Sequence, residues 1–198
     1  EPPKKINLMI EPTNRCNLTC PTCFSHQDGR NKYDMSLEQF KHIIDTNKQL
    51  IGSISLYNYG EPLLHKEIAD MVAYATKHNI KTKIATNGTL LTQKVAQALF
   101  SAGLSYLSIS VDGAKQKSYE TFRQGGSLKK VLTNIKTAVT LPRSTHIELQ
   151  FIIMEHNEHE IDDIKKIAKS LGVDALRLKS LLVKKEEWNY LIPSQKHN

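Results

Sequence analysis

The sequence contains no apolar run close to the roughly 18 residues that a membrane-spanning helix needs. Its first residues, EPPKK, also lack the apolar core of a secretion signal. Hydrophobic residues make up 39% and charged residues 24%, a balance that is typical of a soluble globular protein and excludes a disordered chain. We therefore expect a cytoplasmic protein whose 198 residues form one domain with a sizeable core.

The sequence also lacks an arginine-rich block interleaved with aromatic residues, which a nucleic-acid surface usually has. Lys and Arg number 27 against 20 Asp and Glu, which gives a net charge of +7. The basic residues are nevertheless scattered in short pairs, such as Lys129 with Lys130 and Lys165 with Lys166. Scattered lysines are typical of solvated helix faces, so we expect no nucleic-acid partner.

Cysteine is scarce as well, with three in the whole chain, and all three lie between positions 16 and 23. Disulfide frameworks use cysteines that are spread along the chain, usually in even numbers. The crowding of Cys16, Cys20 and Cys23 into one CxxxCxxC loop therefore indicates a metal or cluster site. Thiolates are soft ligands that suit both iron–sulfur clusters and zinc.

Two kinds of centre fit this loop. Structural zinc usually takes four protein ligands, and His26, three residues after Cys23, could complete such a site. Three cysteines alone instead leave one iron of a 4Fe-4S cubane without a thiolate, and an open metal position is where a cofactor or substrate can coordinate. The loop by itself favours the cluster, and zinc stays the alternative.

Strand-like segments alternate with segments of helical periodicity along most of the chain. Ser36 and Gln39, for example, form a capping-box signature that opens a helix. The predicted helices cover residues 37–50, 65–78, 92–102, 115–123, 127–141 and 158–171. The predicted strands cover residues 6–11, 53–58, 81–86, 105–111, 146–154 and 174–180.

Strands separated by helices predict parallel βα units with right-handed crossovers. Six such units are too few for the eight of a complete barrel, so we expect an α/β fold of the open, partial parallel β/α barrel type. Chemistry in such folds sits at the C-terminal ends of the strands. Cys16, Gly60, Asn87 and Asp112 all follow predicted strand ends, which places them on one rim.

Several motifs occur together and in order: EPTNRCNLTCPTCF at 11–24, GEP at 60–62, TNG at 86–88 and SVDG at 110–113. This set resembles the radical S-adenosylmethionine (SAM) superfamily, and more narrowly the branch whose members often carry a C-terminal SPASM or twitch domain. The resemblance covers nearly all of residues 6–180. Several motifs in order are far more specific than any one of them alone.

The resemblance implies two cofactors, a 4Fe-4S cluster bound by Cys16, Cys20 and Cys23, and S-adenosylmethionine bound to the fourth iron. It implies an enzyme that reductively cleaves S-adenosylmethionine to a 5′-deoxyadenosyl radical, which then takes hydrogen from a peptide, sugar or other small substrate. Reduced flavodoxin or ferredoxin would suit as electron donor. The alternatives are a zinc-binding structural or interaction module, or a catalytically incomplete cluster-binding core of a longer enzyme.

Ten further residues are expected at the cofactor. Eight match or adjoin the family's motifs, Arg123 has a guanidinium that suits the methionine carboxylate, and Gln150 is a polar residue inside an apolar strand, where an unpaired amide would be costly. Each has a structural alternative: a plain turn for GEP and for Asn-Gly, an Asx turn at the aspartate, a helix-end charge for the arginine, and a water or backbone partner for the glutamine. The ten are Phe24, Tyr59, Gly60, Glu61, Thr86, Asn87, Ser110, Asp112, Arg123 and Gln150.

The chain departs from the family's pattern at two places. Tyr59 replaces the first glycine of the family's GGE motif, and Thr22 stands where many relatives carry an aromatic residue. The second departure leaves open whether Phe24 stacks on the adenine.

The sequence assigns no catalytic residue and names no substrate. Arg177 and Lys179 share one face of the last strand by alternation and could meet an anionic substrate. We expect residues 1–183 to form the core domain and residues 184–198 to be a linker or a truncated tail, because no further cysteines follow there.

Overall fold

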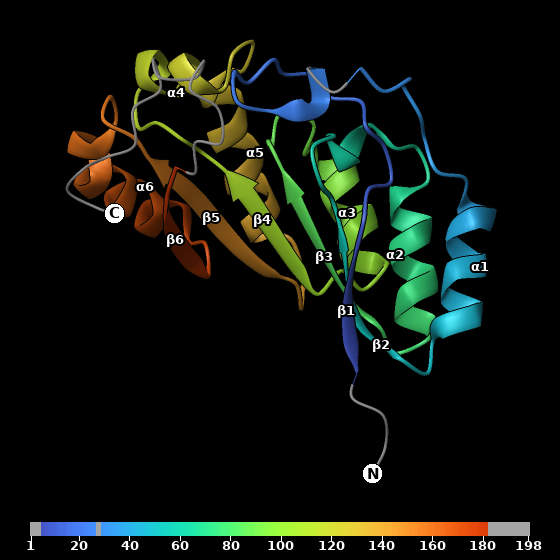
Figure 1. Ribbon diagram of the computed structural model, residues 1–198. Helices are drawn as coiled ribbons and strands as arrows, with labels where there is room; N and C mark the ends of the chain where they lie inside the picture. The colour runs from blue at the N-terminus through green and yellow to red at the C-terminus, as the bar shows by residue number, and fades with distance from the viewer. Residues whose placement is uncertain (1–4, 27–28, 182–198) are drawn as a thin grey trace.

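Six parallel strands form one sheet in the computed structural model, which describes residues 5–26 and 29–181. The strands follow one another in sequence order, β1-β2-β3-β4-β5-β6, so each crossover joins neighbours (Figure 1). The six-unit α/β prediction is confirmed. The strands are β1 (Ile6–Ile10), β2 (Ile51–Leu56), β3 (Lys81–Thr86), β4 (Tyr106–Ser110), β5 (His146–Ile153) and β6 (Ala175–Ser180).

Most helices cover the outer face of this curved sheet, whereas α4 lies near the C-terminal ends of the strands (Figure 1). The α-helices are α1 (Leu37–Asn47), α2 (Ile68–Lys77), α3 (Gln93–Ser101), α4 (Gln116–Phe122), α5 (Leu128–Thr140) and α6 (Ile161–Leu171). Short 3-10 turns are η1 (Phe24–His26), η2 (Pro62–Leu64) and η3 (Glu158–Glu160).

The residues predicted to begin and end helices do so in the structure. The Ser36 hydroxyl accepts a hydrogen bond from the Gln39 backbone N–H at 3.1 Å, and the Gln39 side chain accepts one from the Ser36 N–H at 2.9 Å. These two bonds complete a capping box at the start of α1. Gly172 ends α6 in the left-handed conformation, with φ of 77°.

Some boundaries differ from the prediction for local reasons. The helix expected from residue 65 begins at Ile68, because Pro62–Leu64 first form a 3-10 turn and His65 is extended. The segment expected as one helix over 158–171 divides into η3 and α6. β2 begins at Ile51, two residues early, because Ile51 pairs with Ile6 of β1. The tail at 184–198, and with it the predicted domain boundary, lies outside the described residues.

The two faces of the sheet differ in chemistry. On the outer face, strand residues such as Ile84 and Leu149 are fully buried against helix residues such as Phe40 and Val131. Burying an aliphatic or aromatic side chain of this size contributes about 1.5–3 kcal/mol, so this layer is the main source of stability. The inner face alternates with it and carries polar residues, including Ser108.

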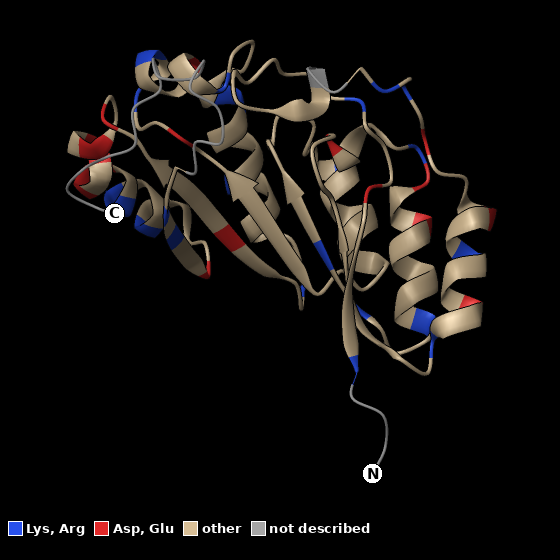
Figure 2. Ribbon diagram, viewed as in Figure 1, with Lys and Arg blue, Asp and Glu red and all other residues tan. Residues whose placement is uncertain are grey.

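Charged residues are spread over many helices and loops rather than gathered in one basic patch (Figure 2). The same view shows that β3, β5 and β6 each carry charge within the sheet. No helix in the part of the chain that the structure describes is both long and apolar enough to cross a membrane.

Candidate active site

The loop between β1 and α1 carries all three cysteines across the C-terminal ends of the strands (Figure 1). Its backbone is fastened at Thr19, whose N–H donates to the Gln124 carbonyl at 3.2 Å. Asn17 ties it to the turn after β3: its amide donates to Thr89 Oγ1 at 2.8 Å, and its carbonyl oxygen accepts from Asn87 at 3.0 Å. The cysteine loop is therefore held over a fixed rim.

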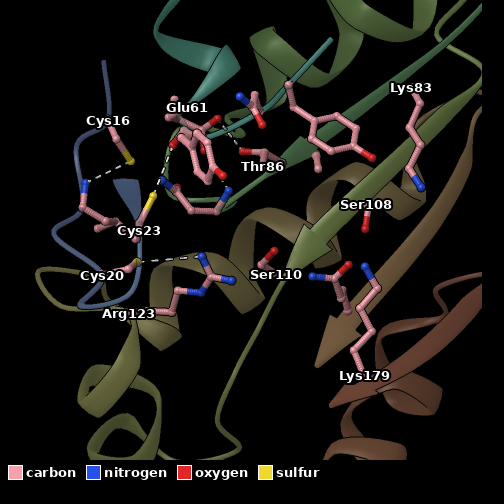
Figure 3. Close-up of a pocket in the computed structure, with 18 residues that line it drawn as sticks. Cys16, Cys20, Cys23, Glu61, Lys83, Thr86, Ser108, Ser110, Arg123 and Lys179 are labelled. Carbon is pink, nitrogen blue, oxygen red and sulfur yellow. Dashed lines mark hydrogen bonds between the residues drawn. The ribbon is translucent and has the colours of Figure 1, made fainter. Parts of the chain in front are cut away.

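All three thiols line one pocket and none forms a disulfide (Figure 3). Cys20 is buried, whereas Cys16 and Cys23 are partly exposed. The Leu18 N–H lies 3.5 Å from the Cys16 sulfur, and the Cys23 sulfur lies 3.5 Å from the Tyr59 carbonyl oxygen. The thiols thus face the turn that follows β2.

The protein environment alone disfavours thiolates here. Burial raises the pKa of Cys16 to about 11, although the Leu18 N–H opposes this shift. Burial also raises the pKa of Cys20, against the nearby Arg123 cation. A thiolate in such surroundings needs a bound cation, because coordination to a metal deprotonates a thiol. Three soft sulfur donors on one loop therefore fit an iron–sulfur cluster.

The zinc alternative needs a fourth ligand. The side chain of His26, which the sequence offers for this role, lies outside the described residues. Across the described part of the chain, no group of three or more His, Cys, Asp or Glu side chains, the three cysteines included, is arranged to hold a single metal ion.

The turn after β2 comes very close to the cysteine loop at Gly60. A Cβ atom there would lie 1.9 Å from the Thr13 carbonyl oxygen, so only glycine fits. The N–H groups of Tyr59 and Gly60 both donate to Glu11 Oε1, at 2.9 and 3.2 Å. These contacts fix the backbone of the turn beside the thiols.

Glu61 joins this turn to the end of β3. Its side chain is 2% exposed, and its carboxylate accepts hydrogen bonds from Thr86 Oγ1 at 2.7 Å, the Asn87 N–H at 2.8 Å and the Leu63 N–H at 3.0 Å. Burial raises the pKa of Glu61 even though these bonds oppose the shift. The Glu61 carboxylate therefore links the turn after β2 to the turn after β3.

Arg123 closes the opposite side of the pocket beside Cys20. Its Nε lies 2.5 Å from Asp112 Oδ2, and its Nη1 lies 3.8 Å from the Cys20 sulfur. Burial opposes the charge, but the Asp112 carboxylate outweighs it and raises the pKa of Arg123, so the guanidinium stays charged. Asp112 is fully buried and also accepts the Ile152 N–H at 2.7 Å.

The structure brings most of the predicted site residues together. The pocket is lined by the three cysteines and, among the ten further candidates, by Tyr59, Gly60, Glu61, Thr86, Asn87, Ser110, Arg123 and Gln150. Phe24 and Asp112 are not among the lining residues. The Phe24 ring packs edge-on against the Tyr59 ring, with 5.2 Å between the ring centres, and Asp112 lies behind Arg123. Direct contact of Phe24 or Asp112 with the cofactor therefore stays a prediction that the pocket lining does not support.

Sequence reasoning missed part of the pocket floor. Lys83 of β3 and Ser108 of β4 line it, together with Lys179 of β6 (Figure 3). The alternation of strand residues could have identified Lys83 and Ser108, because Lys83 shares a face with Ala85, and Ser108 shares a face with Ser110.

The chain is similar to known proteins over most of its length. The model of the radical SAM superfamily matches residues 10–174. An S-adenosylmethionine-dependent nucleotide dehydratase of Selenomonas ruminantium is 36% identical over 189 residues, which cover 91% of this chain and 66% of the relative. An Fe-coproporphyrin III synthase of Methanosarcina barkeri is 28% identical over 162 residues, with 81% and 40% covered.

Solved structures agree on the fold. Streptococcus suis SuiB bound to S-adenosylmethionine superposes with a TM-score of 0.75 at 18% identity, covering 88% of this chain and 40% of that one. The chain therefore spans between about two fifths and two thirds of the relatives named here.

Proposed function

The chain belongs to the radical SAM superfamily, whose enzymes use a 4Fe-4S cluster and S-adenosylmethionine, and we propose that Cys16, Cys20 and Cys23 are its cluster ligands. One observation carries this proposal: the three thiols, all free of disulfides, line the same pocket as the rim turns that match the family's motifs. When bound, the cluster and S-adenosylmethionine supply a 5′-deoxyadenosyl radical that takes hydrogen from a substrate.

The protein's own residues bind and orient the cofactor. We assign the turn at Tyr59, Gly60 and Glu61 to the amino group, because Gly60 brings the backbone close to the thiols. Arg123 offers a fixed positive charge beside Cys20 for the carboxylate. Four further lining residues, Thr86, Asn87, Ser110 and Gln150, offer polar contacts to the nucleoside.

The substrate and partners belong to the same proposal. We infer an enzyme that acts on a peptide, sugar or other small molecule and takes its electron from reduced flavodoxin or ferredoxin. In this scheme residues 1–183 form the core domain and residues 184–198 are a linker. A reducing compartment such as the cytoplasm suits three free thiols that must bind iron.

Anaerobic reconstitution tests the cluster assignment. The wild-type chain is expected to become brown, to bind the iron of one 4Fe-4S cluster, and to change its electron paramagnetic resonance (EPR) spectrum when S-adenosylmethionine is added to the reduced protein. Replacement of each cysteine by serine should remove most of the iron. Thr19→Ser, in the same loop, is the matched control and should retain it. A colourless chain with stoichiometric zinc would instead support the zinc-binding module.

A further inference from the structure

Beyond the cysteine loop, the floor of the pocket carries an excess of positive charge. Three basic side chains project from the inner face of the sheet, Lys83 from β3 and Arg177 and Lys179 from β6. Figure 3 shows Lys83 and Lys179 on either side of Ser108, and both lysines line the pocket that holds the cysteines.

Glu148, a buried carboxylate on the inner face of β5, is already paired. Glu148 is 2% exposed; its Oε2 lies 2.6 Å from Arg177 Nε, and its Oε1 accepts from Ser108 Oγ at 3.2 Å. Burial raises the pKa of Glu148, but hydrogen bonds from Tyr106 and Arg177 outweigh burial and hold the pKa below its ordinary value. Glu148 therefore stays ionised and neutralises Arg177.

Neither Lys83 nor Lys179 has a carboxylate partner of this kind in residues 5–26 and 29–181. The ammonium of Lys83 lies 4.4 Å from the centre of the Tyr106 ring, and that ring is stacked on His146. Burial lowers the pKa of Lys83, and Arg177 adds to this effect while Glu148 opposes it. The exposed side chain of Lys179 has no hydrogen bond or ion pair with any of the residues that the structure describes. Among the described residues on the inner face of β3 to β6, Lys83, Arg177 and Lys179 stand against Glu148 alone, which leaves two positive charges without a paired carboxylate.

We propose that Lys83 and Lys179 together bind a phosphoryl group of the substrate. The inference rests on the proposed function, since the phosphoryl group belongs to that enzyme's substrate. A phosphoryl group bound here would direct the rest of the substrate toward the cysteine loop. A dianionic phosphate matches two separate ammonium groups in charge, and lysine binds phosphate as a point charge. A single carboxylate would instead favour a planar bidentate arginine, and Arg177 is already occupied by Glu148. Ser108 and Gln150, which line the same pocket, supply neutral polar groups beside the lysines.

Calorimetric titration with inorganic pyrophosphate tests this on the reconstituted protein saturated with S-adenosylmethionine. Saturable binding is expected for the wild type. Lys83→Met and Lys179→Met should each weaken it about tenfold or more, which corresponds to about 1.4 kcal/mol. Lys83→Arg and Lys179→Arg should retain most of the affinity. Lys129→Met, an exposed position at the start of α5, removes the same charge far from the pocket and should leave binding unchanged.

Three results would overturn the proposal: no saturable binding by the wild type, an equal loss in Lys129→Met, or competition by succinate as strong as that by pyrophosphate. Visible absorbance and thermal melting of each variant establish that the protein is folded and holds its cluster. The wild-type spectra also separate the two hypotheses. A wild type that fails to assemble a cluster contradicts the proposed function, whereas an intact cluster without pyrophosphate binding contradicts only this inference.

Discussion

The guanidinium of Arg123 is held 2.5 Å from the carboxylate of Asp112, which is fully buried behind the pocket. Because Asp112 also accepts the Ile152 N–H, it fixes the α4 end of the pocket to β5. A buried pair of this kind is costly to break from one side, since the remaining charge loses its partner while staying out of water.

Asp112→Ala should therefore lower the free energy of unfolding by about 3–5 kcal/mol. Urea denaturation of the anaerobic protein measures this. The control is Asp162→Ala, which removes an exposed carboxylate paired with Lys165 at 3.0 Å and should cost much less. Equal losses in the two variants would show that the Asp112–Arg123 pair has no special importance.

Gly60→Ala should disturb the rim even though alanine is small. Its Cβ would meet the Thr13 carbonyl oxygen at 1.9 Å, and backbone on both sides cannot yield without moving the turn away from the thiols. We expect weaker S-adenosylmethionine binding, by about tenfold or more, in equilibrium dialysis of the reconstituted protein. Gly52→Ala is the matched control, since its Cβ would lie 3.0 Å from the Lys5 Cβ and 3.6 Å from the Ile6 carbonyl oxygen, contacts that need a shift of only a few tenths of an ångström. Unchanged affinity in Gly60→Ala would contradict the close-approach argument.

Asn17→Ala should loosen the cysteine loop without unfolding the sheet. The variant loses the hydrogen bonds to Thr89 and Asn87, and each such bond contributes about 0.5–1.5 kcal/mol. Hydrogen exchange should become faster for the loop amides, such as that of Thr19, and stay unchanged within β3. Faster exchange throughout the sheet would mean that Asn17 supports the whole fold instead of the loop.

The Asp174 carboxylate should contribute to the loss of folding stability as the pH falls into the acid range. Hydrogen bonds from Arg143, at 2.7 and 3.1 Å, hold the pKa of Asp174 below its ordinary value; burial opposes this, and the Ile147 N–H adds to it. A carboxyl with a lowered folded-state pKa stabilises the protein above its unfolded pKa of about 3.9, and this stabilisation disappears as the pH falls through the folded value.

Asp174→Asn should accordingly reduce stability at about pH 6 and make less and less difference as the pH falls through the folded-state pKa, because the wild-type carboxyl then becomes neutral like the amide. Thermal melting across this range provides the measurement, with the exposed Glu155→Gln as control. A difference between wild type and Asp174→Asn that persists unchanged at the acid end would exclude the linkage.

Local patterns were enough to place most elements. The capping box at Ser36 and the left-handed Gly172 act within a few residues of themselves, so they could be read without the fold. The predicted boundaries were wrong where pairing with another element sets them, as at Ile51, which belongs to β2 because it pairs with Ile6 of β1. The break at Glu160 follows similarly from its tertiary bonds to the Ala114 N–H and the Ser118 hydroxyl.

The sequence by itself determined that three soft donors lie on one loop, that six βα units follow, and that polar motifs end the strands. Those features depend on spacing along the chain, which the sequence states directly. Only the tertiary structure decided which charges are paired: Glu148 neutralises Arg177, and Asp112 neutralises Arg123, while Lys83 and Lys179 have no paired carboxylate in the part of the chain that the structure describes. Charge pairing depends on distances between strands that are remote in sequence, and those distances exist only once the sheet has formed.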